Sequence, residues 1–368
     1  MPHVASAPST TLSEERLDVA IRLLADAVAS ARVGAAATAI LRNGRLARLE
    51  ALGRTGWPAE SVPLSPDAIF LIASLTKPIV CAGAMLLVQD GLLSLDEPVA
   101  SHLPEFAAHG KEGVLIRHLM THTSGLPDQL ENNVKLRTRH APLSEFAREV
   151  CSLDLLFAPG TRISYQSMGI LMLGEVVQRL TGRPLAHWLR ERLFAPLGMA
   201  RSTLGLPKDG LASAVYAEAS GDPLYGDTSS DWGWNSPYWR ALGAPWGGLH
   251  STAADLGAFL SHMLGVAPGP LCPAARAAMA RDHTAAMPGI PPEQRITQRW
   301  GLGWRLEAAP FSDLVSRQTY GHTGATGTLF WADPQSGLAC VLLTNQPKAS
   351  HILFAHYSNA VASAVPAD

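Results

Sequence analysis

The chain has 368 residues, of which 47% are hydrophobic and 16% are charged, a composition that excludes intrinsic disorder. Lys and Arg number 29 against 31 Asp and Glu, and this near balance argues against nucleic acid as the main partner, because binding phosphates needs a basic surplus. The length suits two domains, or one large domain with an insertion.

The first predicted elements are a helix and two strands. A capping-box pattern at 11–14 (Thr-Leu-Ser-Glu) precedes apolar residues at helical spacing, which end at Gly34. Strand-like runs at 37–42 and 45–52 then flank Asn43-Gly44, a dipeptide typical of tight hairpins. The apolar run at 78–88 is too short to span a membrane, which takes about 20 residues, and it predicts a buried helix.

The N-terminus and the cysteines bear on the cellular compartment. No Lys, Arg or apolar stretch precedes Glu14, so the sequence predicts no secretory signal and a cytoplasmic location. Cys81, Cys151, Cys272 and Cys340 are too far apart for a zinc ribbon or a thioredoxin motif. We therefore expect four buried, free thiols.

The middle of the chain has a different pattern. Helical periodicity occurs at 116–121, 143–151, 168–181 and 185–193, with loops rich in Gly, Pro, Ser and Asp between them. The stretch 205–246 is long for a connection, and it is either a pocket wall or a surface excursion anchored by aromatic rings. Its aromatic residues are Trp232, Trp234, Tyr238, Trp239 and Trp246.

The C-terminal part returns to strands. Runs at 301–306, 328–332 and 338–344 are typical of strands, and a turn at 333–337 joins the last two. A final helix is expected at about 350–365.

Short strands at both ends of the chain, with helices between them, predict an α+β fold. We expect one antiparallel sheet built from both chain ends and flanked by helices, in a domain that comprises 1–91 and 246–368. An inserted, mainly helical domain is expected to comprise 92–245.

The sharpest chemical motif is Ser74-Leu-Thr-Lys77, followed by Pro78. Because Pro favours the first helical turn, a helix is expected to start close to Ser74, with Ser74 and Lys77 on one face. The backbone N–H of Ser74 is then a free donor of the first turn. The serine hydroxyl can then act as a nucleophile, the lysine amine as its base, and the backbone N–H as half of an oxyanion hole. The alternative is a capping serine and a surface lysine, which would show the same spacing.

A second motif lies at 159–167, where a turn leads to Tyr165 and Ser167 at the entrance of an apolar helix. Both hydroxyl groups can point into a cleft at that entrance. The alternative is that Tyr165 packs on the core and Ser167 caps the helix.

A third motif lies at 320–328, where three glycines surround His322 and Thr323. Glycines let a ligand approach the backbone closely, and an exposed N–H such as that of Ala325 can complete an oxyanion hole. The alternative is a tight turn before an edge strand.

Ser-x-x-Lys, Tyr-x-Ser and His-Thr-Gly, in this order, resemble the serine β-lactamase and penicillin-binding-protein superfamily. The closest resemblance is to its class C-like branch, which includes the family VIII carboxylesterases, and it implies a β-lactamase-like fold. Four further segments are typical of this group, namely 115–126 (LIRHLMTHTSGL), 196–199 (PLGM), 247–256 (GGLHSTAADL) and 321–345.

The resemblance implies a role for each matching residue. Ser74 would be the acylated nucleophile, Lys77 would help to deprotonate it, and Tyr165 would be the general acid and base. The N–H groups of Ser74 and Ala325 would hold the oxyanion. Either Lys77 is neutral or Tyr165 is a phenolate at pH 7, and the sequence leaves open which of them takes the serine proton.

Two positions depart from the family's β-lactamases. Ser167 stands where Asn is usual, and His322 stands where Lys is usual. These two residues, with Thr323, Gly324 and the aromatic Trp246, are the expected substrate-binding residues. A shorter polar group and a largely neutral imidazole weaken the recognition of a β-lactam's amide and carboxylate, so uncharged esters or small amides are favoured.

Other chemistries lack a motif. His118 and His122 are four residues apart, but no Glu follows His118 and no third ligand is near, so no metal and no cofactor are expected. The sequence therefore predicts a serine hydrolase for a small-molecule ester or amide, with no nucleic-acid or membrane partner. The alternatives are an acyltransferase, a β-lactamase or D-amino-acid peptidase, and a non-catalytic binding protein.

Overall fold

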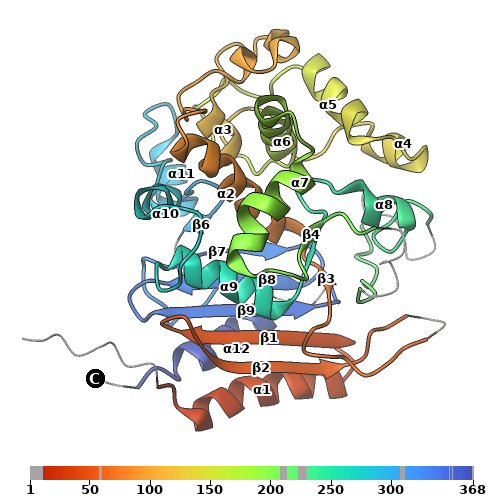
Figure 1. The fold of residues 1–368 in the computed structure, drawn as a ribbon, viewed down its shortest axis with the longest axis vertical. Coiled ribbons are helices and arrows are strands. Elements are labelled where there is room, and N and C mark those ends of the chain that lie inside the picture. The colour runs from red at the N-terminus through yellow and green to blue at the C-terminus, as the bar shows by residue number, and fades with distance from the viewer. Residues whose placement is uncertain are drawn as a thin grey trace, which may run out of the picture.

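The computed structural model describes residues 11–57, 60–207, 214–222, 230–306, 311–347, 349 and 351–366. Its central feature is a six-stranded antiparallel sheet with the strand order β2-β1-β9-β8-β7-β6 (Figure 1). The strands are β1 (Ala35–Arg42), β2 (Arg45–Gly53), β6 (Arg305–Leu306), β7 (Tyr320–Gly324), β8 (Thr328–Asp333) and β9 (Leu338–Thr344).

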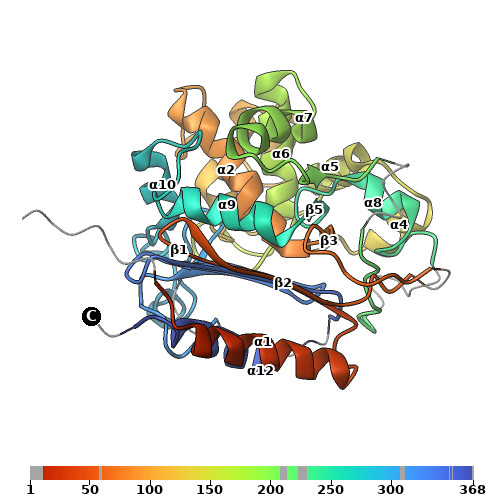
Figure 2. The same cartoon turned by 60° about the horizontal axis from the view of Figure 1, so that its bottom comes forward.

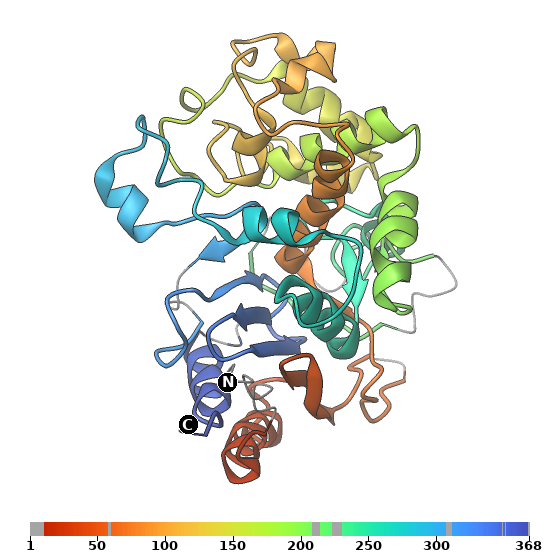
Figure 3. The same cartoon turned by 60° about the vertical axis from the view of Figure 1, so that its left-hand side comes forward.

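The two chain ends meet where β1 pairs with β9, with Ala36 opposite Thr344. All residues of β1 are buried, because two helices cover one face of the sheet and a third covers the other (Figure 2). The third helix contains Gly257, and a side chain at that position would collide with Leu41 of β1, so this helix packs directly on the strand. These helices are α1 (Glu14–Ala29) with α12 (His351–Ala362), which lie side by side (Figure 3), and α9 (Ala253–Met263). The predicted α+β fold with one sheet from both chain ends is confirmed.

The helix α2 (Thr76–Gln89) carries the first motif into the middle of the molecule. A one-turn 3₁₀ helix, η1 (Ala73–Leu75), leads directly into it, and Pro78 lies in its first turn. The helix is buried on almost every side, as its apolar sequence predicts. It packs against α6 (Met168–Thr181) and α10 (Pro273–Ala280).

Most remaining helices gather above the sheet on the side of α2 (Figure 1). The patterns at 116–121, 143–151, 168–181 and 185–193 all correspond to observed helices, whereas the limits at 92 and 245 stay a prediction. The helices above the sheet, apart from α2, α6, α9 and α10, include α3 (Ile116–Met120), α4 (Asn133–Thr138), α5 (Leu143–Ser152), α7 (Leu185–Leu189) with the π-helical turn η4 (Arg190–Phe194), and α8 (Pro237–Leu242). Shorter elements are η2 (Val99–Ser101), η3 (Pro104–Ala107), η5 (Ala195–Leu197), α11 (Pro292–Thr297) and a small sheet of β3 (Phe70–Leu71), β5 (Leu249–Ser251) and β4 (Thr203–Leu204).

The structure corrects one strand prediction and the turn alternative for 320–328. The run at 301–306 is a strand only in its last two residues, because Gly303, at φ +81°, turns the chain against α2 so closely that a Cβ there would lie 2.8 Å from Cys81 Sγ. The glycine-rich segment at 320–328 is not only a turn before an edge strand. Its first part is β7 itself, which pairs with both β6 and β8.

The thiol prediction is correct in one respect and wrong in another. All four cysteines are free, but only Cys81 and Cys340 are buried. Cys151 is half-buried and Cys272 is exposed, because Cys272 caps the N-terminus of α10, where its sulfur accepts the N–H of Ala275. None of the helices in the described ranges is both long enough and apolar enough to cross a membrane.

Candidate active site

Ser74 and Lys77 are in direct contact at the start of α2. Lys77 Nζ lies 2.9 Å from Ser74 Oγ, and it donates a second hydrogen bond of 2.9 Å to the backbone carbonyl of Trp246. Ala73 adopts φ +47°, a left-handed conformation that alanine rarely takes, so the backbone is strained immediately before Ser74. The turn thereby presents the hydroxyl group, which is half-buried, beside the amine.

Burial changes the acid–base chemistry of Lys77. Its side chain is 1% exposed, and desolvation lowers the pKa of the ammonium group to about 7, against a smaller raising effect of the Asp128 carboxylate. A large fraction of Lys77 is therefore neutral at pH 7, and a neutral amine can accept a proton. Lys77 Nζ also lies 4.7 Å from the centroid of the Tyr165 ring.

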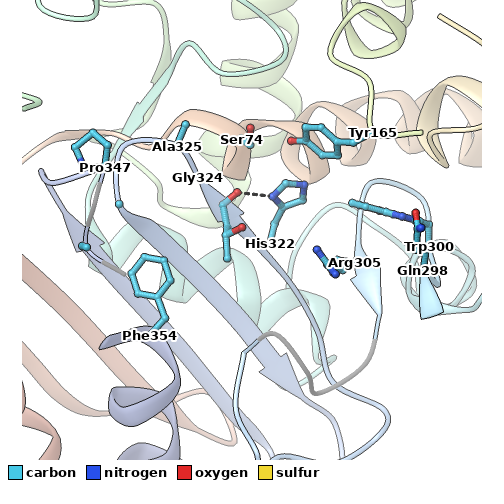
Figure 4. Close-up of a pocket in the computed structure, with 13 residues that line it drawn as sticks. Ser74, Tyr165, Gln298, Trp300, Arg305, His322, Gly324, Ala325, Pro347 and Phe354 are labelled. Atoms are coloured by element: carbon cyan, nitrogen blue, oxygen red, sulfur yellow. Dashed lines mark hydrogen bonds between the residues drawn. The ribbon is translucent and has the colours of Figure 1, made fainter. Parts of the chain in front are cut away.

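The second motif brings Tyr165 to the same place. Tyr165 comes from the turn before α6, and its phenol group and the Ser74 hydroxyl face each other at the top of a cavity (Figure 4). A hydroxyl, an amine and a phenol from sequence positions 74, 77 and 165 thus converge. This is the geometry that covalent catalysis through a serine requires.

The third motif is held against the Ser74 turn by two threonine side chains, one in the β7–β8 connection and one at the start of β8. Thr326 Oγ1 donates to the carbonyl of Leu71 (2.7 Å), and Thr328 Oγ1 donates to the carbonyl of Ile72 (2.9 Å). A Cβ at Gly324 would lie 2.5 Å from the Ile72 oxygen, so only glycine fits there. Ala325, the next residue, faces the cavity near Ser74 (Figure 4).

His322 is a neutral residue in this site. Its Nδ1 is 2.7 Å from the carbonyl of Thr323, and its Nε2 is buried with no hydrogen-bond partner in the described part of the chain. Desolvation, together with smaller contributions from the nearby charges of Lys77 and Arg305, lowers the pKa of His322 to about 3. Because Nδ1 must donate to a carbonyl, Nε2 carries the lone pair and is able to accept a hydrogen bond.

The cavity has a volume of about 790 Å³, and several of the residues that line it were not predicted as site residues from the sequence. Trp300 and Gln298 lie on the side of Tyr165, together with Arg305, which reaches the cavity from β6 (Figure 4). Pro347 and Phe354 lie on the opposite side (Figure 4). No local pattern distinguishes these five residues, since they meet only through the paths of β6 and α12.

Two predicted substrate-binding residues lie elsewhere. Among the described residues that line the cavity, neither Ser167 nor Trp246 appears. The Ser167 hydroxyl donates instead to Asp128 at 2.5 Å. The Trp246 ring is buried against Phe146 and Trp239, and the residue reaches the site through its carbonyl, which accepts from Lys77. His322, Thr323 and Gly324 do line the cavity.

The aromatic residues of 205–246 do not form this cavity wall either, because no described residue of that stretch lines it. Trp234 and Trp239 are buried, and the Tyr238 hydroxyl donates to the carbonyl of Ala141. These contacts correspond to the anchored-excursion alternative. Two parts of this stretch, 208–213 and 223–229, lie outside the described residues.

His118 and His122 do not form a metal pair. Nδ1 of His118 accepts the N–H of Leu115, and Nδ1 of His122 accepts the N–H of Gln166, each at 3.1 Å. Throughout the described ranges, no cluster of three or more His, Cys, Asp or Glu side chains has a geometry that could hold a metal ion.

Comparison with known proteins now identifies the group to which the chain belongs. The family model described as Beta-lactamase matches residues 20–360. The chain belongs to the beta-lactamase family. This membership confirms the resemblance deduced from the three motifs.

Individual relatives include an esterase and a penicillin-binding protein. The chain is 36% identical to Esterase EstB of Burkholderia gladioli over 53% of its own length, and this match spans about half (54%) of the esterase. It is 33% identical to Penicillin-binding protein 4 of Amycolatopsis lactamdurans, over 77% of the chain and 74% of that protein. A solved structure with the same fold is EstCE1, described as a hydrolase with promiscuous acyltransferase activity, with a TM-score of 0.79 at 21% identity over 94% of this chain and 98% of that one. The family and its esterase member together support an enzyme of the serine-hydrolase class.

Proposed function

We propose that this protein is a serine hydrolase that cleaves small carboxylic esters through an acyl-enzyme on Ser74. The hydrogen bond of 2.9 Å between Lys77 Nζ and Ser74 Oγ, made by a lysine with a pKa of about 7, carries the proposal. A nucleophilic serine needs a base at hydrogen-bond distance that is unprotonated at working pH. Lys77 lies at that distance, and its pKa of about 7 supports the presence of a neutral fraction near pH 7.

In the acylation step, neutral Lys77 takes the proton of the Ser74 hydroxyl while Oγ attacks the ester carbonyl carbon. The N–H groups of Ser74 and Ala325 stabilise the negative oxygen that results. The ester C–O bond then breaks, and the Tyr165 hydroxyl gives its proton to the departing alkoxide. Tyr165 recovers a proton from the Lys77 ammonium, which lies close to its ring, so that Lys77 is neutral again.

In the deacylation step, a water molecule takes the place of the alcohol that has left. The Lys77–Tyr165 pair accepts a proton from this water, and its oxygen attacks the acyl carbon. The bond to Ser74 Oγ breaks, the serine oxygen regains a proton, and a carboxylic acid is released. Both steps use the same groups in opposite directions.

The charges along the cavity favour a second substrate class as well. Arg305 lines the cavity on the side of Tyr165, where the leaving group departs, although the family's usual motif lysine is replaced by the neutral His322. A guanidinium group binds carboxylates strongly. We therefore propose amides or esters whose leaving group ends in a carboxylate as the second candidate, and the relationship to a penicillin-binding protein supports it.

The deciding experiment combines mass spectrometry with kinetics. Mixing the protein with a fluorophosphonate is expected to give one covalent adduct that maps to Ser74. Ser74→Ala is expected to lose both the adduct and the turnover of a short-chain p-nitrophenyl ester, and Tyr165→Phe is expected to slow turnover by about 10²–10⁴-fold. Ser144→Ala, an exposed serine on α5, serves as the matched control. An adduct on another residue, or wild-type turnover by Ser74→Ala, would exclude the proposal.

A further inference from the structure

One histidine holds the backbone on both sides of Tyr165. The carbonyl of His122 accepts the N–H of Ser164 at 2.9 Å, and Nδ1 of the same residue accepts the N–H of Gln166 at 3.1 Å. The residue before Tyr165 and the residue after it are therefore both bonded to His122. Rotation of this peptide segment would break at least one of these bonds.

The imidazole ring of His122 also packs against the Tyr165 side chain. The two ring centroids are 4.6 Å apart, and the indole of Trp300 lies perpendicular to the imidazole at 4.2 Å. His122 is completely buried, and it is not among the described residues that line the cavity. It thus packs against the phenol ring without lining the cavity itself.

The hydrogen bond at Nδ1 fixes the state of the ring. Because Nδ1 accepts an N–H, the single proton of neutral imidazole must lie on Nε2. Burial, together with the charges of Lys77 and His322, holds the pKa of His122 well below its usual value. The acceptor at Nδ1 is therefore present throughout the pH range in which Lys77 changes its charge. Nε2 is buried without a hydrogen-bond partner among the described residues.

The backbone at His122 is strained as well, with φ +60° in the left-handed region. Glycine and asparagine adopt this conformation more easily than histidine does. A residue that served only to turn the chain would not need an imidazole. The histidine adopts this conformation at an energetic cost, and both its acceptor and its ring contact the Tyr165 segment.

We propose that His122 is the positioning residue of Tyr165, which it holds at the height and angle needed for proton transfer at Ser74. This proposal rests on the function proposed above, in which Tyr165 exchanges protons with the leaving group and with water. His122 takes no part in the chemistry, and it acts only through Tyr165.

The test is a double-mutant cycle between His122 and Tyr165, with an ester substrate. His122→Ala is expected to lower kcat on the order of 10²-fold with little change in KM, because a catalytic group displaced by about 1 Å loses that much. In the Tyr165→Phe background, the same substitution is expected to have almost no further effect, since the group that it positions is already gone. His122→Asn, which keeps an acceptor at the same distance from the backbone and tolerates positive φ, is expected to regain most of kcat.

A matched control is His118→Ala, which removes a neighbouring buried histidine whose Nδ1 also accepts a backbone N–H but which has no ring contact with Tyr165 among the described pairs. Thermal unfolding is measured for every variant. If His122→Ala does not fold, His122→Asn is compared with His122→Gln, whose acceptor lies one bond farther out and is expected to restore less activity.

Three results would overturn the proposal. The first is an equal loss of kcat from His122→Ala in the wild-type and Tyr165→Phe backgrounds. The second is a kcat of His122→Asn that is no higher than that of His122→Gln or His122→Ala. The third is a fall in kcat of the same size in His118→Ala. Failure of the proposed function itself would appear differently, as full activity of Tyr165→Phe or Ser74→Ala in the presence of an intact His122.

Discussion

Arg305 on the edge strand β6 and His322 on the adjacent strand β7 line the same cavity, one as a cation and the other as a neutral imidazole. Arg305 pairs with Gly321, the residue before His322, so the two side chains start from neighbouring positions of the sheet. The substitution of the family's usual lysine by histidine therefore does not leave this end of the cavity without positive charge. The positive charge is supplied instead by Arg305 on the adjacent strand β6.

Removal of the Arg305 charge should separate substrates by their own charge. Arg305→Met is expected to lower kcat/KM for esters with a carboxylate on the alcohol part by about 10-fold or more, because a hydrogen bond to a charged group contributes about 1.5–3 kcal/mol. Neutral esters of the same size should be affected little. Arg190→Met, an exposed arginine of η4, is the control. An equal loss of kcat/KM for charged and neutral esters would show that Arg305 does not bind the carboxylate of the substrate.

The pH dependence of the reaction should follow Lys77. Its pKa in the folded protein is lowered to about 7 by burial, so the amine loses its proton as the pH rises through about 7. Since the neutral amine is the proposed base, kcat/KM is expected to increase with pH and to level off above this value. A pH–rate profile with a neutral ester measures it. A profile that falls between pH 6 and 8 would contradict the role of Lys77.

A new charge at position 322 should change this profile. His322→Lys would place an ammonium group near Lys77, and like charges disfavour the protonated state. The midpoint of the rise in kcat/KM is therefore expected to move to a lower pH. The same variant should increase any hydrolysis of a β-lactam, which carries a carboxylate, more than hydrolysis of a neutral ester. Parallel changes for both substrates would argue against carboxylate recognition at this position.

Gly324 should tolerate no side chain. In Gly324→Ala, the new methyl group would meet the Ile72 carbonyl, and the strands around it must move. Overpacking of this kind typically costs about 1–3 kcal/mol, and the movement would also shift Ala325 away from Ser74. We expect a lower free energy of unfolding, measured by denaturant titration, and a lower kcat. Gly113→Ala, where a Cβ meets no atom within 4 Å, should have neither effect.

Much of the architecture could be predicted because local chemistry and tertiary structure agree. The Asn43-Gly44 hairpin connects β1 and β2 as expected, and the apolar run after Pro78 is a buried helix. Ser13 caps α1 by accepting the N–H of Arg16, within the predicted capping segment. Signals of this kind depend on neighbours in the sequence.

The site could be predicted only where it is made of motifs. Ser74 and Lys77 are one helical turn apart, so their contact follows from spacing alone. Trp300 and Phe354 enter the cavity through tertiary packing, and no local spacing records that approach. Trp246 was predicted to bind substrate, whereas its indole packs against Phe146 and Trp239 and its carbonyl accepts a hydrogen bond from Lys77.

The pairing of β1 with β9 has a consequence for synthesis of the protein. On the ribosome, the N-terminal hairpin emerges long before its partner strand, from which about 300 residues separate it; the Thr38 hydroxyl, for example, bonds to a carbonyl 303 positions later. Until that strand arrives, β7 and β8 have no sheet to join, and the half of the cavity that they supply is missing. Translation of nearly the whole chain is thus required before the cavity around Ser74 is complete, so we expect incomplete chains to lack the proposed activity.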